Sequence, residues 1–449
     1  MISGQYWTEG RETKDFEEVC RRRAQLGGSP GRWVDHRAVC RTAKMTFNKQ
    51  IMPVDEQRML IERQGDLQEL CEHIRSCGEV AFDTEFVSDA GYRAELGLLQ
   101  FATEERTVAV DPLAVESLQP WWDVMSDETT TIIVHGGQAE VRFCIQEGGC
   151  LPQRVVDIQI AEGLRSRSFP LAYAAIIERV LGVRVSSHQT RSNWLKRPLS
   201  TEQLSYALED VSYIPEAWAK QKQWLESQGR LAWAEAEFSR MCDDVRRETE
   251  QPPWARLSGL PRLSRRELAT AMELACWRDR VAQSRNRSPR RILRDDLLMD
   301  LARRRPSNEQ QVLATRDLNR PDYRRLLPEI LEVVESAGQI PEADLPRRIP
   351  RAEESGSDEQ TVARLLALAV ANRCAELDLA QALVGTNRDL LDAVRILRGD
   401  GNRSEAKLLT GWRNDTFGEL LEHVISGKIW FRVAPPSSAV PLVFEKRDS

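Results

Sequence analysis

The 449-residue sequence predicts an α/β domain with a mixed sheet, followed by two all-α helical bundles. Three observations support this order. Apolar runs with strand character succeed one another between residues 80 and 110, and apolar strands then alternate with helical segments. Beyond residue 260 the apolar spacing is helical. A strand meander followed by alternating helices and strands is typical of a mixed sheet flanked by helices.

The chain is too long for one ordinary core, and about three domains are expected at this length. The helical pattern breaks near Pro252-Pro253, and a second stretch rich in proline, glutamate and serine indicates a linker. The predicted boundaries are 1–55 for a poorly ordered N-terminal extension, 56–245 for the α/β domain, 260–340 for the first helical domain, 341–360 for the linker, 361–433 for the second helical domain and 434–449 for a disordered tail.

Composition describes a soluble globular protein, with 41% hydrophobic residues, 29% charged residues and a net charge of −6. No run approaches the roughly 18 apolar residues of a membrane span, so we expect a cytoplasmic protein with no membrane partner. We also expect a monomer. The nine cysteines form no C-x-x-C pair and the five histidines are not expected to cluster with them. The sequence therefore predicts reduced thiols and no zinc site.

Each element of the α/β domain has a local signal. Leu60-Ile61 has the character of a short strand, and Asp66 is a candidate N-cap for a helix that ends near Cys77. Three strands then follow as an antiparallel meander. The later elements are expected to be a helix to about 125, a strand at 131–134, a helix from about 137, a strand at 155–156, helices around 158–164 and 171–181, and a helix that Ser200 caps with Gln203.

Two carboxylates interrupt the apolar strand at residues 80–87. Asp83 and Glu85 are two residues apart, so their side chains point to the same face of the strand. Two like charges on an otherwise apolar strand repel each other and lose solvation unless a cation neutralises them. Taken alone, such a pair is also compatible with a strand end whose acids face water.

Further acidic residues fall where they can join this pair. Glu140 lies near the beginning of the helix after the strand at 131–134 and faces back toward the sheet. Tyr206 and Asp210 lie one turn apart on one face of the helix that begins after Ser200. Taken alone, Tyr206 is compatible with a core tyrosine and Asp210 with a surface acid. Together they give four carboxylates and a tyrosine from one α/β unit.

The segment from about Met59 to Trp224 resembles ribonuclease D and the wider DEDD class of 3′→5′ exonucleases, in its tyrosine-containing subclass. The ordered set of motifs carries the resemblance, and the D-T-E triplet alone is a weak signal. The motifs are Phe82-Asp83-Thr84-Glu85-Phe86, Leu96-Gly97-Leu98-Leu99-Gln100, Val134-His135-Gly136-Gly137, Val155-Val156-Asp157-Ile158-Gln159, Thr190-Arg191-Ser192-Asn193-Trp194-Leu195-Lys196-Arg197-Pro198-Leu199, Gln203-Leu204-Ser205-Tyr206-Ala207 and Asp210-Val211-Ser212-Tyr213.

The resemblance implies a ribonuclease-H-like fold and catalysis by two divalent metal ions, Mg²⁺ or Mn²⁺, held by carboxylates. It implies that Asp83 bridges both ions. Glu85 and Asp210 would hold the ion that activates water, and Glu140 would occupy the fourth acidic position. Tyr206 has a reference pKa of about 10, so we expect it to orient the attacking water rather than act as a base.

The second motif departs from the family pattern. The family places an aspartate five residues after the histidine, and this chain has Glu140 at that distance from His135. The charge is kept, but the added methylene moves the carboxylate, and a misplacement of about 1 Å can cost about 100-fold in rate. We expect Asp157 to cap the helix that begins at Ile158 rather than bind metal, and we assign His135 no ligand role.

The second half of the chain contains a locally basic region. Residues 262–325 carry 17 lysine and arginine residues against nine aspartate and glutamate residues, an excess of eight positive charges in an acidic protein. Such an excess favours contact with phosphates over a merely solvated face. The region resembles the helicase-and-RNase-D C-terminal (HRDC) domain, and residues 361–433 resemble a more divergent copy. The candidate nucleic-acid-binding residues are Arg285, Arg287, Arg290, Arg291, Arg303, Arg304 and Arg305.

These inferences lead to a 3′→5′ exoribonuclease that trims transfer-RNA precursors or other structured RNA at the 3′ end. RNA as the partner follows from the resemblance alone, because no residue in the sequence must read a 2′-hydroxyl. Two alternatives stay open: a DNA 3′-exonuclease, or a nucleic-acid-binding protein whose exonuclease site has lost activity. Substitution of Asp83 distinguishes an enzyme from the inactive binding protein.

Overall fold

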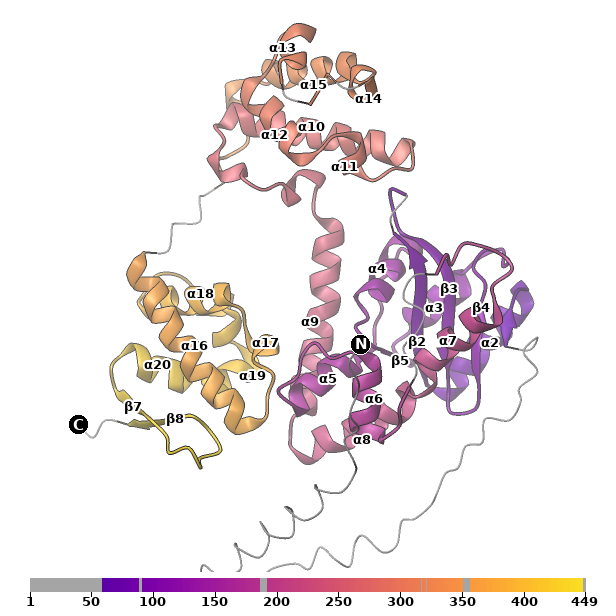
Figure 1. The fold of residues 1–449 in the computed structure, drawn as a ribbon, viewed down its shortest axis with the longest axis vertical. Helices are drawn as coiled ribbons and strands as arrows, with labels where there is room; N and C mark the ends of the chain where they lie inside the picture. The colour runs from indigo at the N-terminus through magenta and orange to yellow at the C-terminus, as the bar shows by residue number, and fades with distance from the viewer. Residues whose placement is uncertain are drawn as a thin grey trace, which may run out of the picture. The chain divides into compact units, whose positions relative to one another are not determined.

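The computed structural model describes residues 59–88, 91–185, 192–315, 317–319, 321–349 and 356–446 (Figure 1). The predicted N-terminal extension at 1–55 and the first residues of the motif that begins at Thr190 lie outside these ranges. Within them, no helix is long and apolar enough to cross a membrane.

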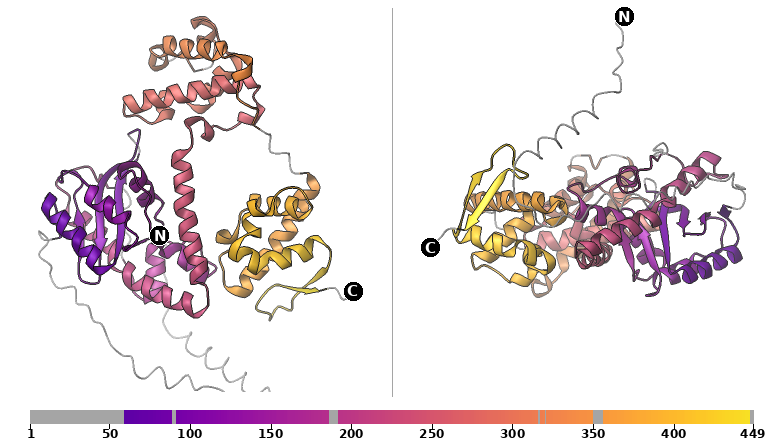
Figure 2. Two further views of the ribbon diagram at one scale, coloured as in Figure 1. Left: turned by 180° about the vertical axis from the view of Figure 1, so that it is seen from behind. Right: turned by 90° about the horizontal axis from the view of Figure 1, so that it is seen from below.

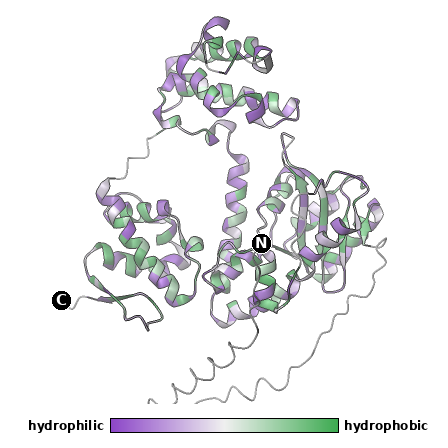
Figure 3. Ribbon diagram, viewed as in Figure 1, coloured by the Kyte–Doolittle hydropathy of each residue, from purple (hydrophilic) through white to green (hydrophobic). Residues whose placement is uncertain are grey.

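The α/β domain is built on a six-stranded mixed sheet in the order β1-β4-β3-β2-β5-β6 (Figure 1). The middle strands β2, β3 and β4 form the predicted antiparallel meander, and β1, β5 and β6 join their neighbours in parallel. Hydrophobic residues predominate along the strands (Figure 3). The bounds are β1 Leu60–Ile61, β2 Glu79–Val87, β3 Glu95–Ala102, β4 Thr107–Val110, β5 Thr131–Val134 and β6 Val155–Asp157.

Helices cover both faces of this sheet (Figure 2). One face carries an aromatic cluster, in which the rings of Phe82 and Trp121 are 4.6 Å apart and those of Phe101 and Trp121 4.7 Å apart. The other face packs against α7 through a small core that includes Leu98 and Leu208. The helices are α2 Gln64–Cys77, α3 Gln119–Met125, α4 Gln138–Glu147, α5 Ile158–Arg165, α6 Tyr173–Leu181, α7 Thr201–Ser212, α8 Ile214–Ser227 and α9 Leu231–Glu250.

The predicted caps are confirmed at two helices and wrong at one. Ser200 and Gln203 form a complete capping box at α7, and Asp157 accepts from the backbone N–H groups of Gln159 and Ile160 at the start of α5. Helix α2 begins three residues earlier than expected, so Arg63 is its N-cap. Asp66 lies in the first turn instead, where it binds Arg63 at 2.9 Å. A carboxylate stabilises a helix N-terminus both at the N-cap and in the first turn, so the sequence alone did not distinguish these two positions for Asp66.

The first helical bundle has its own hydrophobic core. The segment predicted as the 341–360 linker is partly packed on this bundle, since Leu345 is buried and its carbonyl accepts from the Arg265 guanidinium at 2.8 Å. The elements are η3 Pro253–Arg256, η4 Leu260–Arg262, α10 Arg265–Ser284, α11 Pro289–Ile292, α12 Asp295–Arg304, α13 Glu309–Leu313, α14 Pro321–Arg324, α15 Leu327–Gln339 and η5 Glu342–Asp344.

The second helical domain ends in a β-hairpin that the sequence prediction missed. Strand β8 lies within the tail predicted to be disordered, and it pairs antiparallel with β7, in a segment predicted to be helical. The rings of Phe431 and Phe444 are 5.7 Å apart across the pair, and such cross-strand aromatic pairs stabilise hairpins. The elements are α16 Ser357–Leu377, α17 Gln381–Val384, α18 Asn387–Leu397, η6 Arg403–Glu405, η7 Lys407–Leu409, α19 Gly411–Arg413, η8 Asn414–Gly418, α20 Glu419–Ile425, β7 Ile429–Val433 and β8 Leu442–Lys446.

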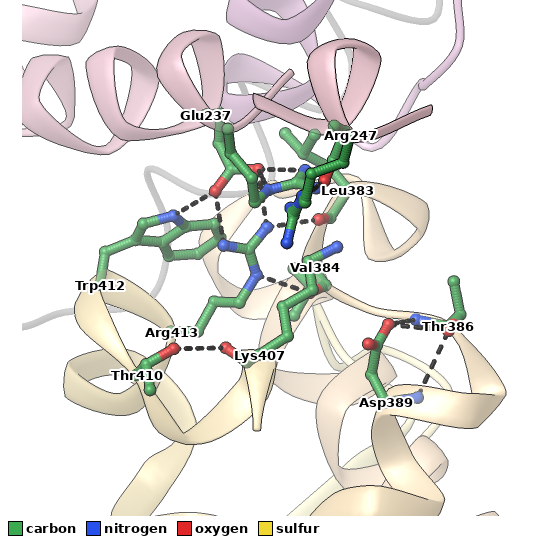
Figure 4. Close-up of polar contacts among 12 residues, drawn as sticks. Glu237, Arg247, Leu383, Val384, Thr386, Asp389, Lys407, Thr410, Trp412 and Arg413 are labelled. Atoms are coloured by element: carbon green, nitrogen blue, oxygen red, sulfur yellow. Dashed lines mark hydrogen bonds and ion pairs between the residues drawn. The ribbon is translucent and has the colours of Figure 1, made fainter. Parts of the chain in front are cut away.

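A buried ion pair joins the second helical domain to α9 (Figure 4). The Glu237 side chain is 1% exposed and accepts hydrogen bonds from Arg413 and from the Trp412 indole, the latter at 2.9 Å. Arg240, one turn along α9, donates to the same carboxylate. We refer to Glu237, Arg240, Trp412 and Arg413 as the Glu237 anchor.

Candidate active site

Strand β2 projects two carboxylates onto the face of the sheet that α7 covers. Asp83 lies opposite Gln100 in the β2–β3 register and Glu85 lies opposite Leu98. Directly opposed residues of an antiparallel pair share one face, and Leu98 packs in the core beneath α7. Asp83 and Glu85 therefore share one face of the sheet, as their spacing predicts, and this is the face that α7 covers.

Helix α7 adds Asp210 and Tyr206. The capping box at Ser200 fixes where this helix begins, and the spacing of four residues places both side chains on one helical face. A hydrogen bond from the Tyr206 hydroxyl acts on the Asp210 carboxylate, and Asp210 is close enough to raise the pKa of Asp83 and of Glu85.

Glu140 completes the group from the first turn of α4. Its side chain is 4% exposed, and the Thr84 hydroxyl donates to its carboxylate at 2.6 Å. Asp157 holds the start of this helix by accepting from the backbone N–H groups of Gly136 and Gly137, at 3.1 and 3.2 Å. The structure thus brings together Asp83, Glu85, Glu140 and Asp210, which we call the acidic cluster, with Tyr206 beside it.

Burial raises the pKa of every member of the acidic cluster, and repulsion by other members raises the pKa of Asp83 and Glu85 further. Burial, then Glu140 and Glu85, hold the pKa of Asp83 well above its usual range. Burial and the charge of Asp210 raise the pKa of Glu85 to about 8. Burial raises the pKa of Glu140 to about 7 against the opposing hydrogen bond from Thr84, and raises that of Asp210 to about 6. Keeping all four carboxylates ionised in this arrangement therefore costs free energy, and a bound cation would lower that cost.

The donor set fits divalent metal ions. Among the described residues, no lysine or arginine forms an ion pair with any of the four carboxylates. An all-oxygen set of this kind suits Mg²⁺ or Mn²⁺ rather than zinc. Asp83, Glu85, Glu140 and Asp210 are the residues that would hold the ions.

Burial and the nearby Asp210 raise the pKa of Tyr206 above its ordinary value. The phenol therefore stays protonated at neutral pH and acts as a hydrogen-bond donor. His135, which the sequence did not assign as a ligand, contacts the Leu171 carbonyl through Nε2 at 2.9 Å. Sequence reasoning missed two side chains beside the cluster, Thr84 and Gln100, although both stand inside motifs that it quoted.

The prediction that histidines and cysteines stay apart was wrong for one pair. The Nε2 atom of His73 is 3.5 Å from the Sγ atom of Cys77, because residues four apart share a helical face. Glu105 faces the other ring nitrogen at 3.8 Å, so the three residues could hold a metal ion. The Thr103 hydroxyl, however, lies 3.2 Å from His73 Nε2, and ordinary hydrogen bonding accounts for the group. The seven described cysteines are free thiols, as predicted.

The candidate nucleic-acid-binding arginines are all exposed on the first helical bundle. Arg290, Arg291 and Arg303 line a hollow of about 710 Å³ together with Arg294, which the sequence analysis did not single out. Aspartates share this hollow, and Asp295 and Asp300 hold Arg290 and Arg303 at 3.0 and 3.3 Å. Arg285 lies 3.9 Å from Glu329. Arg287, Arg291, Arg304 and Arg305 form no ion pair with another described residue.

Comparison with known proteins agrees with this geometry. A family described as 3′→5′ exonuclease matches residues 59–223, and the HRDC domain family matches residues 267–334. Ribonuclease D of Desulfotalea psychrophila is 28% identical over 370 residues, which cover 80% of this chain and 96% of that protein. Ribonuclease D of Zymomonas mobilis is 28% identical over 388 residues, covering 86% and 98%.

A solved structure extends the likeness beyond the α/β domain. The crystal structure of Escherichia coli RNase D, described as an exoribonuclease involved in structured RNA processing, matches with a TM-score of 0.72 and 26% identity. The match covers 82% of this chain and 98% of that one. The mixed sheet, the ordered motifs and the helical domains agree with these matches, and the chain is similar to ribonuclease D over most of its length.

Proposed function

We propose that this protein is a 3′→5′ exoribonuclease that hydrolyses phosphodiester bonds with the help of two divalent ions, Mg²⁺ or Mn²⁺. The observation that carries the proposal is the acidic cluster. Four carboxylates, of which Glu140 is buried and the other three are partly buried, lie near one another and form no ion pair with a lysine or arginine among the described residues, and loss of solvation raises the pKa of each. Folding brings them together at a cost that metal binding would offset.

Each side chain has a distinct task in this proposal. When bound, the two ions supply an activated water and stabilise charge on the attacking and leaving oxygens. Asp83 would hold both ions, while Glu85 and Asp210 would hold the one that carries the water. The Tyr206 phenol stays protonated because burial raises its pKa, so we expect its hydroxyl to orient the water rather than to act as a base.

The exposed arginines of the first helical bundle supply the second part of the proposal. Arg287, Arg291, Arg304 and Arg305 have guanidinium groups without a carboxylate partner among the described residues, so a phosphate need not displace an existing ion pair. Arginine's planar fork suits phosphate oxygens. Arg285, Arg290 and Arg303 already neighbour acids and are expected to contribute less.

The Escherichia coli relative is involved in structured RNA processing, which favours structured RNA as the substrate class of this chain. Within that class, we propose 3′ ends of transfer-RNA precursors or similar RNA. The monomeric state and the cytoplasmic location expected from the sequence stay predictions.

A 5′-labelled RNA with a single-stranded 3′ extension tests the activity directly. Products are followed with Mg²⁺, with Mn²⁺ and with EDTA, beside an all-deoxy oligonucleotide of the same sequence. We expect a ladder that shortens from the 3′ end with either metal, and faster shortening of the RNA. Faster cleavage of the deoxy strand would favour the DNA exonuclease.

The matched controls are Asp83→Asn, which removes a central carboxylate, and Asp66→Asn, which removes an exposed carboxylate on α2. Only the first should abolish the ladder. Intact RNA in every lane, from protein that still binds it, would show that the fold is an RNA-binding scaffold with an inactive site.

A further inference from the structure

Gln100 is fully buried in the middle of β3, with 0% exposure. Neither its side-chain oxygen nor its side-chain nitrogen has a hydrogen-bond partner among the described residues. A buried amide in this state opposes folding, because it has given up its bonds to water. Native proteins satisfy most such groups, so an unsatisfied one needs an explanation.

The register places Gln100 against the acidic cluster. Gln100 lies directly opposite Asp83 in the antiparallel β2–β3 pair, so both side chains project from the same face of the sheet. Opposed residues have Cβ atoms about 4.5–5.5 Å apart, a distance that a glutamine side chain can span. On its other side Gln100 pairs with Ala109, which packs in the small core beneath α7. The amide is thus enclosed between the strand that carries Asp83 and the helix that carries Asp210.

An apolar residue would pack better at this position if stability were the only requirement. Its cross-strand neighbour Ala109 and Leu98, two residues along β3, are both apolar and fully buried. Retaining an unsatisfied amide among them is the kind of local conflict that proteins show at functional sites.

We propose that Gln100 is a positioning residue of the metal site, and that its side-chain amide supports the Asp83 carboxylate when metal is bound. The N–H group would donate to Asp83, directly or through one water molecule, and so keep the carboxylate turned toward the ions. This inference rests on the proposed function, since it assumes that the acidic cluster binds metal. Partners of this kind, which orient a ligand without touching the metal, typically change metal affinity by about 10- to 100-fold.

Metal binding and stability, measured separately, test the proposal. Mn²⁺ affinity is measured by calorimetry and electron paramagnetic resonance on the full chain, and the melting temperature is measured in EDTA. We expect Gln100→Leu to bind Mn²⁺ at least about tenfold more weakly while melting no lower than the wild type, because an unsatisfied amide is removed. Gln100→Met keeps the side-chain length and tests the same point should the leucine variant fail to fold.

Thr130→Val is the matched control. Thr130 is also fully buried with an unpartnered polar atom, but it precedes β5 at the end of the sheet where Thr131 pairs with Glu79. Its removal should leave Mn²⁺ affinity unchanged. Wild-type affinity in both Gln100 variants would overturn the positioning role and leave the two-metal proposal standing. Absence of Mn²⁺ binding by the wild type would instead overturn the two-metal proposal and this inference with it.

Discussion

Two sites in this protein hold buried or partly buried carboxylates, and their surroundings shift the carboxylate pKa values in opposite directions. In the acidic cluster, four acids face one another, and burial and repulsion raise the pKa of Glu85 to about 8. In the Glu237 anchor, one acid faces two arginines. Burial alone would raise the pKa of Glu237, but the hydrogen bonds and charges of Arg413 and Arg240 lower it to about 2.

This difference distinguishes the acidic cluster, which needs a cation from outside the chain, from the Glu237 anchor, whose carboxylate is neutralised by arginines of the chain itself. The Glu237 carboxylate accepts hydrogen bonds from Arg413, Arg240 and Trp412, so its charge and lone pairs are satisfied within the chain. The acidic cluster has only the Thr84 and Tyr206 hydroxyls as side-chain donors among the described residues. The Glu237 anchor, whose charges are paired within the chain, fixes how α9 meets α19. In the acidic cluster the carboxylates repel one another, and a bound cation would reduce that repulsion.

The largest expected effect is on cleavage. Asp83→Asn should reduce the rate of RNA shortening to below about one hundredth of wild type, because the central metal-holding carboxylate is lost. In EDTA the same variant should melt at the same temperature or higher, because repulsion with Glu85 and Glu140 falls. Single-turnover cleavage checks the predicted rate, and calorimetry checks the predicted melting temperature. A large fall in melting temperature would place Asp83 among structural acids such as Glu237.

Removing the charge of Glu237 should lower stability and leave cleavage largely unchanged, the reverse of the effect expected for Asp83→Asn. Glu237→Gln leaves Arg413 buried without its anion, which typically costs about 3–5 kcal/mol. Hydrogen exchange should show lost protection in α9 and α19, while cleavage of a short single-stranded RNA is largely kept. Glu235→Gln, at an exposed position of the same helix, is the control. Equal cleavage losses in Glu237→Gln and Asp83→Asn would remove the distinction between the two groups.

The stability of the metal-free protein should depend on pH with opposite signs at the two groups. The raised pKa of Glu85 means that the folded state keeps a proton which the unfolded state releases above about pH 4.5, so stability falls as pH rises toward 8. The lowered pKa of Glu237 gives stability that is present above about pH 4.5 and is lost as pH falls toward 2. These shifts correspond to contributions on the order of 5 kcal/mol for Glu85 and 3 kcal/mol for Glu237.

Melting temperatures in EDTA from pH 3 to pH 9 check this prediction. Glu85→Gln should flatten the slope on the alkaline side, and Glu237→Gln the slope on the acidic side. A slope that neither substitution changes would mean that other groups control it.

The smallest expected effect concerns the extra methylene of Glu140. The longer side chain reaches the Thr84 hydroxyl at 2.6 Å, and Glu140→Asp should lose that bond. A bond to a charged group is worth about 1.5–3 kcal/mol, so cleavage should fall by about tenfold or more although aspartate is the residue of the family pattern. Thr84→Val should cause a similar loss, and the double variant should lose little more than either single one. Faster cleavage by Glu140→Asp would show that the glutamate impairs the site.

Much of the site follows from periodicity in the sequence. A strand period of two puts Asp83 and Glu85 on one face, and a spacing of four does the same for Tyr206 and Asp210. The C-terminal hairpin was missed because its strands are only five residues long and lie apart in the chain, so each gave too little alternation to distinguish it from a helix end or a tail.

The sequence by itself determined the mixed sheet, the two helical domains and the residues that carry the acidic chemistry, because these depend on local spacing and on an ordered set of motifs. Only the tertiary structure decided which groups meet across long separations. Thr84 with Glu140, Gln100 with Asp83 and Glu237 with Arg413 each depend on how faces pack, and no local period encodes that pairing. Whether a buried acid acquires a cationic partner or stays without one is therefore set by packing, and that outcome distinguishes the candidate active site from the anchor.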